Sequence, residues 1–143
     1  MRLLSKGPSP HLSWAELACH DGTPYPVEWR LNRAVRLAVE FELVRKRVGG
    51  PIRILSAYRT AERNRLVGGA RNSEHVQGRA LDMEPPPGMT VARLHELVLA
   101  EAAEPDSRIR GVGLYPWGVH MDVRPAERLA RWVHGRPAAD EVA

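Results

Sequence analysis

Three residues of the sequence have the types and spacing of a metal site. His75 and Asp82 lie seven positions apart in the segment SEHVQGRALDM, and His120 lies in the later segment GVHMDVR. Two imidazoles and a carboxylate suit a borderline cation such as zinc, and three protein ligands leave a fourth position for water. A metal ion there lowers the pKa of bound water and polarises a carbonyl group, so the pattern indicates hydrolytic chemistry.

The segment that carries the first two residues is predicted to be a loop followed by a strand. Alternation over 79–84 places Asp82 on one face of the strand while its neighbours point into the core. Gly78 suits a left-handed turn that would aim His75 back toward Asp82. The alternative interpretation is that His75 only caps a turn.

The segment that carries His120 is predicted to be a second strand, 118–124. Its apolar residues form one face, which places His120 and Asp122 together on the other face. If this strand runs beside the strand of Asp82, the two polar faces converge. The alternative is that His120 and Asp122 form a pair on an exposed face of the sheet.

Caps and periodicity predict the elements around these strands. We expect a short helix capped by Ser13, the longest helix from Val27 to about Arg47, and helices capped by Thr60 and Thr90. Further strands are expected at 52–56 and 109–115, the latter joined to 118–124 by a hairpin at Pro116 and Trp117. From Pro125 onward we expect one or two amphipathic turns and then a frayed C-terminal tail. The predicted class is α+β with a small, mainly antiparallel sheet flanked by helices.

Length and composition favour one soluble domain. The chain has 143 residues, of which 43% are apolar and 27% are charged, with a single cysteine. We expect one domain over 1–143 with a core of about 12–134, a monomer, and no membrane span. The N-terminus lacks the apolar run of a signal peptide, so synthesis in the cytoplasm is expected. A net charge of +4 favours anionic partners, but the scattered arginines argue against nucleic acid.

Several segments in the same order resemble one family of enzymes. The pattern Ser-x-His-x-x-Gly-x-Ala-x-Asp over 73–82 is similar to the signature of zinc D-alanyl-D-alanine carboxypeptidases (VanY-like enzymes) and related peptidoglycan peptidases. These belong to the superfamily shared with lysostaphin-type enzymes and the hedgehog signalling domain. The upstream segment SAYRTAERNRLVGGARNSEH and the downstream segment WGVHMDVR match as well, so the resemblance covers about 12–124.

The resemblance implies a role for each matched residue. It makes His75, Asp82 and His120 the ligands of one zinc ion. Arg59 matches an arginine that faces the substrate and stabilises an oxyanion or binds a carboxylate, for which a guanidinium is suited. The alternative is that Arg59 braces its loop by bonding backbone carbonyls. Ser73 is expected to order the loop of His75 or to contact substrate, and the alternative is an ordinary serine of a turn.

The sequence departs from the family pattern at the proton carrier. Many relatives have a carboxylate three residues before the last zinc histidine, where this chain has Trp117. Asp122 is our candidate for the general base, because it shares the face of His120. It could equally orient His120 without touching the substrate. Trp117 itself is expected to line the substrate groove.

The expected function is therefore zinc-dependent hydrolysis of a peptide bond in peptidoglycan stem peptides. The bond would be a terminal D-Ala-D-Ala bond or an internal bond of the L-Ala-D-Glu type. The enzyme would act on the cell wall, and its source would be a bacterium or a phage, with the missing export signal favouring a phage. A rival expectation is a zinc-containing binding or structural module without catalysis, which the missing carboxylate at Trp117 favours. A second rival is a basic domain that binds nucleic acid.

Overall fold

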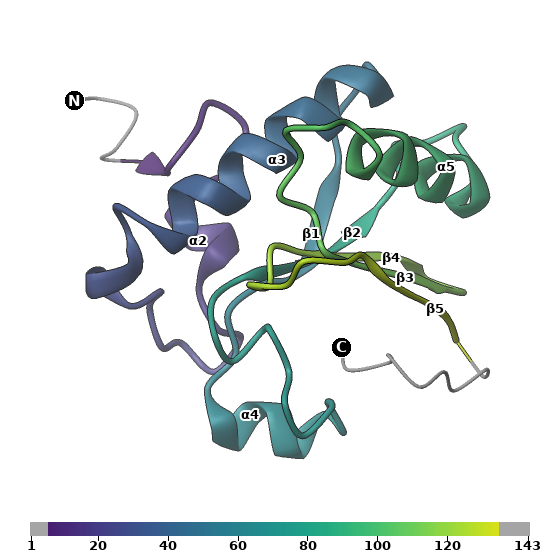
Figure 1. Cartoon of the computed structure of the whole chain (residues 1–143). Coiled ribbons are helices and arrows are strands. Elements are labelled where there is room, and N and C mark those ends of the chain that lie inside the picture. The colour runs from purple at the N-terminus through teal and green to yellow at the C-terminus, as the bar shows by residue number, and fades with distance from the viewer. Residues whose placement is uncertain (1–5, 135–143) are drawn as a thin grey trace.

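The chain folds as helices packed on a five-stranded sheet. A computed structural model describes residues 6–134 (Figure 1). The helices are α2 (Trp14–Leu17), the 3-10 turn η1 (Val27–Trp29), α3 (Arg33–Val48), α4 (Ala61–Leu66) and α5 (Val91–Ala102). The strands are β1 (Arg53–Ser56), β2 (Ala80–Glu84), β3 (Gly111–Tyr115), β4 (Gly118–Asp122) and β5 (Ala130–Val133). Between residues 6 and 134, none of the helices has the length and apolar character needed to cross a membrane.

The sheet has the strand order β1-β2-β4-β3-β5. Neighbouring strands are antiparallel except for β3 and β5, which are parallel. The prediction of an α+β fold with a mainly antiparallel sheet is therefore confirmed. The hairpin between β3 and β4 also forms where Pro116 and Trp117 were expected to turn the chain.

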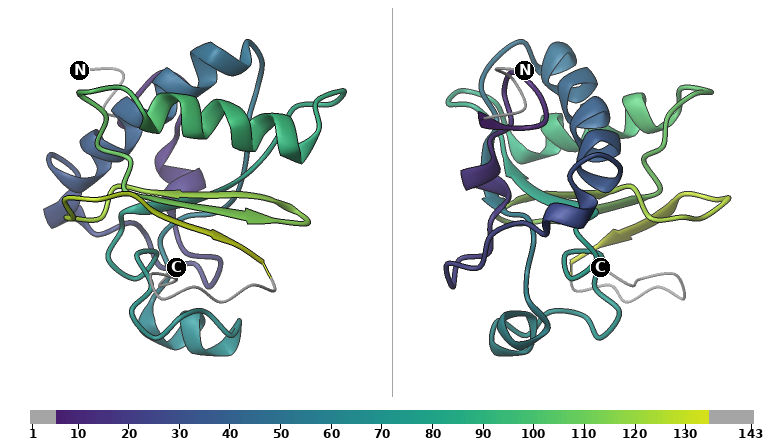
Figure 2. Two further views of the ribbon diagram at one scale, coloured as in Figure 1. Left: turned by 45° about the vertical axis from the view of Figure 1, so that its right-hand side comes forward. Right: turned by 90° about the vertical axis from the view of Figure 1, so that its left-hand side faces the viewer.

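The two faces of the sheet are covered differently. Figure 2 shows α3 and α5 on one side of the sheet and α4 on the opposite side. The apolar side chains of the strands and of α3 and α5 form the hydrophobic core, and they include Leu81, Met83, Val119 and Met121. Because side chains alternate along a strand, Asp82 and His120 point to the side of α4.

Three helices begin at the residues that the sequence indicates. Ser13 and Glu16 form a reciprocal capping box at the start of α2. The side chains of Thr60 and Thr90 accept hydrogen bonds from the backbone amides of Arg63 and Arg93 at the starts of α4 and α5. These caps satisfy amide groups that have no partner within the helix, which is why the chain starts a helix there.

The longest helix begins six residues later than predicted. The apolar pattern suggested a start at Val27, but α3 starts at Arg33, after the separate turn η1. The Asn32 side chain accepts a hydrogen bond from the Arg33 amide at 2.6 Å and caps the helix. Leu31, which fitted the helical pattern, is 80% exposed. At the other end, Gly49 adopts a left-handed conformation with φ of 74°, so the helix ends where expected.

The prediction of amphipathic turns after Pro125 was wrong for the described residues. The segment instead forms β5, which adds to the exposed edge of β3 in parallel register. Trp132 is buried while Arg131 and Val133 on either side are exposed, which is the alternation of a strand. The free backbone groups of β3 supply hydrogen-bonding partners, so this tertiary contact outweighs local helical preference. The predicted frayed tail over 135–143 lies outside the described residues.

Candidate metal centre

The sheet brings the three predicted ligands together. In the register of β2 and β4, Asp82 lies directly opposite His120. Asp82 Oδ1 lies 3.0 Å from His75 Nε2 and 3.1 Å from His120 Nδ1. The three ligand atoms all lie within 4.8 Å of one another, and all three residues are buried. The alternative of a pair on an exposed sheet face is wrong, because His120 and Asp122 are 1% and 0% exposed.

The outer nitrogen of each imidazole has a partner that fixes which nitrogen is left for a metal. His75 Nδ1 lies 2.6 Å from the carbonyl oxygen of Ala57. A carbonyl only accepts hydrogen bonds, so Nδ1 carries the proton and Nε2 faces Asp82. His120 Nε2 lies 2.7 Å from Asp122 Oδ2, which leaves Nδ1 facing Asp82. Because both inward nitrogens and a carboxylate oxygen converge, the residues fit a zinc ion.

The loop of His75 is fixed from several sides. Ser73 is buried, and its hydroxyl accepts a hydrogen bond from the His75 amide at 3.1 Å. Gly78 has a φ of 69°, and a Cβ there would lie 2.7 Å from the Trp29 ring. The Tyr25 hydroxyl donates a hydrogen bond of 2.7 Å to the Gly78 carbonyl. The turn between His75 and Asp82 therefore requires glycine both for its conformation and for its space.

Asp122 lies behind His120, on the side away from Asp82. Besides the contact with His120, its two oxygens accept hydrogen bonds of 2.8 Å and 2.6 Å from the Arg124 guanidinium. Burial tends to raise the pKa of Asp122, but the hydrogen bonds from Arg124 and His120 outweigh it and hold the pKa well below its ordinary value. Asp122 is thus an ionised carboxylate in contact with the outer nitrogen of His120.

Carboxylates also control the charge of His120. Burial tends to lower its pKa, but hydrogen bonds with Asp122 and Asp82 raise it to about 9. His75 has the opposite balance, because burial lowers its pKa more than Asp82 raises it. The two imidazoles therefore differ in basicity although both contact the same carboxylate oxygen.

Arg59 lies beside the cluster, in the turn before α4. Its Nη2 donates to Asp82 Oδ2 at 3.2 Å, while Nε and Nη1 donate to Ser56 Oγ and Asn64 Oδ1, each at 3.2 Å. The guanidinium is thus held by side chains and not by the backbone carbonyls of the alternative interpretation. Burial lowers the pKa of Arg59, and the Asp82 charge opposes that shift. The Asp82 carboxylate is shared between the imidazoles on one oxygen and Arg59 on the other.

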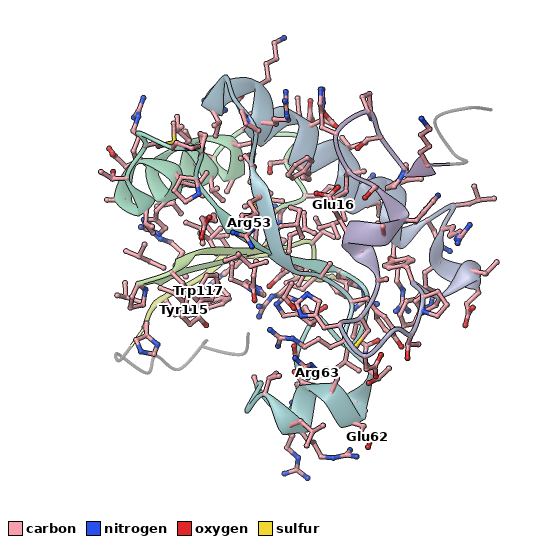
Figure 3. All side chains as sticks on the ribbon, turned by 180° about the vertical axis from the view of Figure 1, so that it is seen from behind. Glu16, Arg53, Glu62, Arg63, Tyr115 and Trp117 are labelled. Atoms are coloured by element: carbon pink, nitrogen blue, oxygen red, sulfur yellow. The ribbon has the colours of Figure 1, made fainter. Side chains whose placement is uncertain are left out.

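The cluster opens into a cavity of about 410 Å³. Its walls come from the turn before α4, the chain after α4, β2 and the β3–β4 hairpin, and comprise Arg59, Val67, Gly68, Gly69, Ala70, His75, Asp82, Tyr115, Trp117 and His120. Trp117 is 40% exposed and stacks on Tyr115 with ring centroids 4.7 Å apart. Figure 3 shows these two rings together at the tip of the hairpin. Ser73 and Asp122 do not line this cavity.

Two aromatic residues of the site were missed at the level of sequence. Tyr115 lines the cavity, and Trp132 of β5 packs on the His120 ring with centroids 5.2 Å apart. The Trp132 indole donates a hydrogen bond of 2.9 Å to the Tyr115 hydroxyl. Gly113, opposite Trp132 in the register, makes room, since a Cβ there would lie 2.3 Å from the indole nitrogen. For Tyr115, its position two residues before Trp117 in the sequence was an available signal. Trp132 can be assigned to the site only after β5 is placed beside β3.

Comparison with known families agrees with the geometry. The family model described as Peptidase M15 matches residues 10–122. The chain therefore belongs to the peptidase M15 family, whose members are zinc-dependent, and it is a metallopeptidase with zinc as its cofactor. No curated protein matches the sequence.

Proposed function

We propose that the chain hydrolyses a peptide bond in peptidoglycan stem peptides and holds one zinc ion through His75, Asp82 and His120. The observation that carries the proposal is a buried set of two imidazoles and one carboxylate that opens into a cavity. The chemistry that such an ion supplies is polarisation of the scissile carbonyl and a lower pKa of water. The bond is a terminal D-Ala-D-Ala bond or an internal bond of the L-Ala-D-Glu type.

Arg59 is proposed to bind a carboxylate of the substrate or the oxyanion that develops during hydrolysis. It lines the cavity, and three hydrogen bonds hold its guanidinium in place. A charged donor that is already positioned loses little freedom when the substrate charge arrives, which is the requirement for stabilising a transition state. Trp117, with its exposed face at the cavity, is proposed to contact the side chains of the stem peptide.

Asp122 is proposed to orient His120, and not to accept a proton from water. Its complete burial and its bonds to His120 and Arg124 support this choice between the two roles open at the sequence level. A general base must reach the reacting water, whereas Asp122 does not line the cavity. Ser73 is proposed to order the loop of His75, for which its hydrogen bond to the His75 amide is the support.

The rival is a zinc-containing module without catalysis. One observation favours it: among the described residues, the cavity lining contains no carboxylate other than Asp82. A proton carrier of the kind that metallopeptidases use is therefore missing from the walls formed by residues 6–134. The two functions make different predictions for the zinc-loaded protein on its substrate.

The deciding experiment is digestion of purified muropeptides by the zinc-loaded chain, read by mass spectrometry. We expect a loss of D-alanine or cleavage within the stem, and the mass of the product identifies the bond. His75→Ala and Asp82→Ala should lose both zinc and cleavage. His95→Ala, on α5 and outside the cavity, is the matched control and should retain both.

Two results would contradict parts of the proposal. Unchanged zinc content in His75→Ala and Asp82→Ala would remove the assigned ligands. Zinc bound by these residues with every muropeptide left intact would instead support the non-catalytic module.

A further inference from the structure

A second cavity, of about 290 Å³, has six arginines in its walls. They come from the start of α3, the residues before β2 and β3, and the end of β4, and comprise Arg33, Arg36, Arg79, Arg108, Arg110 and Arg124. The cavity therefore lies at the end of the sheet opposite the β3–β4 hairpin. None of its residues lines the metal cavity, so we treat it as a separate site, named here the arginine cavity.

Two of the six guanidinium groups have a carboxylate as partner. Arg79 Nη1 lies 3.2 Å from Glu74 Oε1, and Arg124 Nη2 lies 2.6 Å from Asp122 Oδ2. Within residues 6–134, no carboxylate lies within 4.0 Å of the guanidinium groups of the other four arginines. Four of the six guanidinium groups in the walls of the arginine cavity therefore have no ion-pair partner within that distance among the described residues.

Two of those four arginines are held in place by neutral groups. Arg33 Nη1 donates to the Gln77 carbonyl at 2.8 Å, and its guanidinium lies 4.1 Å from the centre of the Trp29 ring. Arg110 Nη1 donates to the carbonyls of Ser107 and Ile109 at 2.8 Å and 2.9 Å. Carbonyl oxygens fix the direction of a guanidinium but bring no formal negative charge to it.

The remaining two, Arg36 and Arg108, are exposed at the edge of the cavity. Crowding of like charges is also visible at Arg33, where burial and the nearby Arg79 charge lower the pKa. Holding several like charges around one space costs free energy unless an anion occupies it. Arg33 and Arg110 are therefore already oriented by hydrogen bonds, whereas the exposed side chains of Arg36 and Arg108 can adjust to a bound anion.

We propose that the arginine cavity binds a phosphate-bearing anion. A phosphate group brings up to two negative charges and three acceptor oxygens, which matches several guanidinium forks around one space. A single carboxylate brings one negative charge and two acceptor oxygens, which is fewer than the four guanidinium groups without an ion-pair partner can bind. The site is independent of the peptidase proposal, because it shares no residue with the metal cavity.

The test is a titration of the zinc-loaded chain followed by the backbone amide signals of residues 108–112, 123, 124 and 126. The probes are inorganic phosphate, a phosphomonoester such as glycerol phosphate, and a short single-stranded oligonucleotide as a phosphodiester, with sodium acetate at equal ionic strength as reference. We expect saturable shifts with at least one phosphate probe and none with acetate. The probe that binds most tightly shows which source of phosphate the site prefers.

Variants make the test specific for the cavity. Arg36→Gln and Arg108→Gln should each raise the Kd for the phosphate probe about tenfold. The loss of one charge-assisted hydrogen bond commonly weakens binding by about that factor. Arg93→Gln removes the same charge from the exposed face of α5 and should leave the affinity unchanged. Peptidase activity on a soluble muropeptide should be the same in all three variants.

The proposal is overturned by either of two results. The first is the absence of saturable shifts with all phosphate probes. The second is equal affinity in Arg36→Gln, Arg108→Gln and Arg93→Gln, which would show that binding reflects only the overall positive charge of the chain.

Discussion

Asp122 has two possible roles at the level of sequence, and its contacts in the structure favour one of them. Alternation along β4 placed it on the face of His120, which fits both a proton acceptor and an orienting group. Only the direction of the His120 ring separates the two, because Nδ1 faces Asp82 and Nε2 faces Asp122. A carboxylate on the outer nitrogen of a metal-binding histidine fixes the ring and strengthens the ligand.

Asp122→Asn tests this assignment. The loss of the negative charge at the outer nitrogen should weaken zinc binding by about 10- to 100-fold, as replacements of such outer partners commonly do. Zinc affinity is measured by competition with a chromophoric chelator, and circular dichroism confirms that the variant folds. A general base would give a different pattern, with unchanged zinc affinity and lower kcat at saturating zinc.

At the scale of elements, the sheet register decides which side chains meet. Asp82 and His120 pair directly across β2 and β4, so a shift of either strand by one residue would turn its own residue of this pair to the core side. The core-facing residues of the same strands hold this register against α5 and α3. On that side, α3 carries the buried Glu40, which is 2% exposed and accepts a hydrogen bond from Ser107 Oγ at 3.2 Å.

Glu40→Gln should stabilise the chain more at neutral than at acidic pH. Burial raises the pKa of Glu40, and its hydrogen bonds and the Arg108 charge only partly offset this. The folded state therefore holds the proton more tightly than the unfolded state, and stability is lost as pH rises from the unfolded pKa through the folded pKa. Glutamine keeps the acceptor oxygen without that loss, so the gain in free energy of unfolding should be larger at pH 7 than at pH 4.

Urea denaturation at the two pH values measures this difference. Glu96→Gln, on the exposed face of α5, is the matched control. An equal gain at both pH values for Glu40→Gln would contradict the argument, since it would show that the buried carboxylate does not titrate between them.

For the molecule as a whole, the hydrophobic core and the metal centre lie on opposite sides of the same sheet. The core is formed by the strands with α3 and α5, whereas α4 and its flanking loops cover the site (Figure 2). Loss of the metal is therefore expected to leave the packing of the hydrophobic core in place. The core gives the domain a source of stability that needs no metal, unlike domains in which zinc replaces a core.

Removal of zinc by a chelator should lower the melting temperature while the chain stays folded. Metal that binds only the folded state adds about 2.7 kcal/mol at a free concentration one hundred times its Kd. We expect a cooperative transition and an unchanged far-ultraviolet circular dichroism spectrum after chelation. His75→Ala, as the matched control, should melt at the same temperature with and without chelator. Loss of secondary structure on chelation would show that the metal is needed to fold the core.

Much of this protein follows from local patterns that a sequence displays. Caps at Ser13, Thr60 and Thr90 and alternation along β2 and β4 act over a few residues, so most of the elements could be predicted. The three candidate ligands were assigned through the resemblance to the family, because their spacing alone left other interpretations open. The start of α3 at Arg33 was missed because the cap formed by Asn32 interrupts a pattern that looked continuous. Long-range packing decided the rest: β5 needed the edge of β3, and the role proposed for Asp122 depends on the orientation of the His120 ring. The arginine cavity joins four separate segments, and only the folded chain brings their charges together.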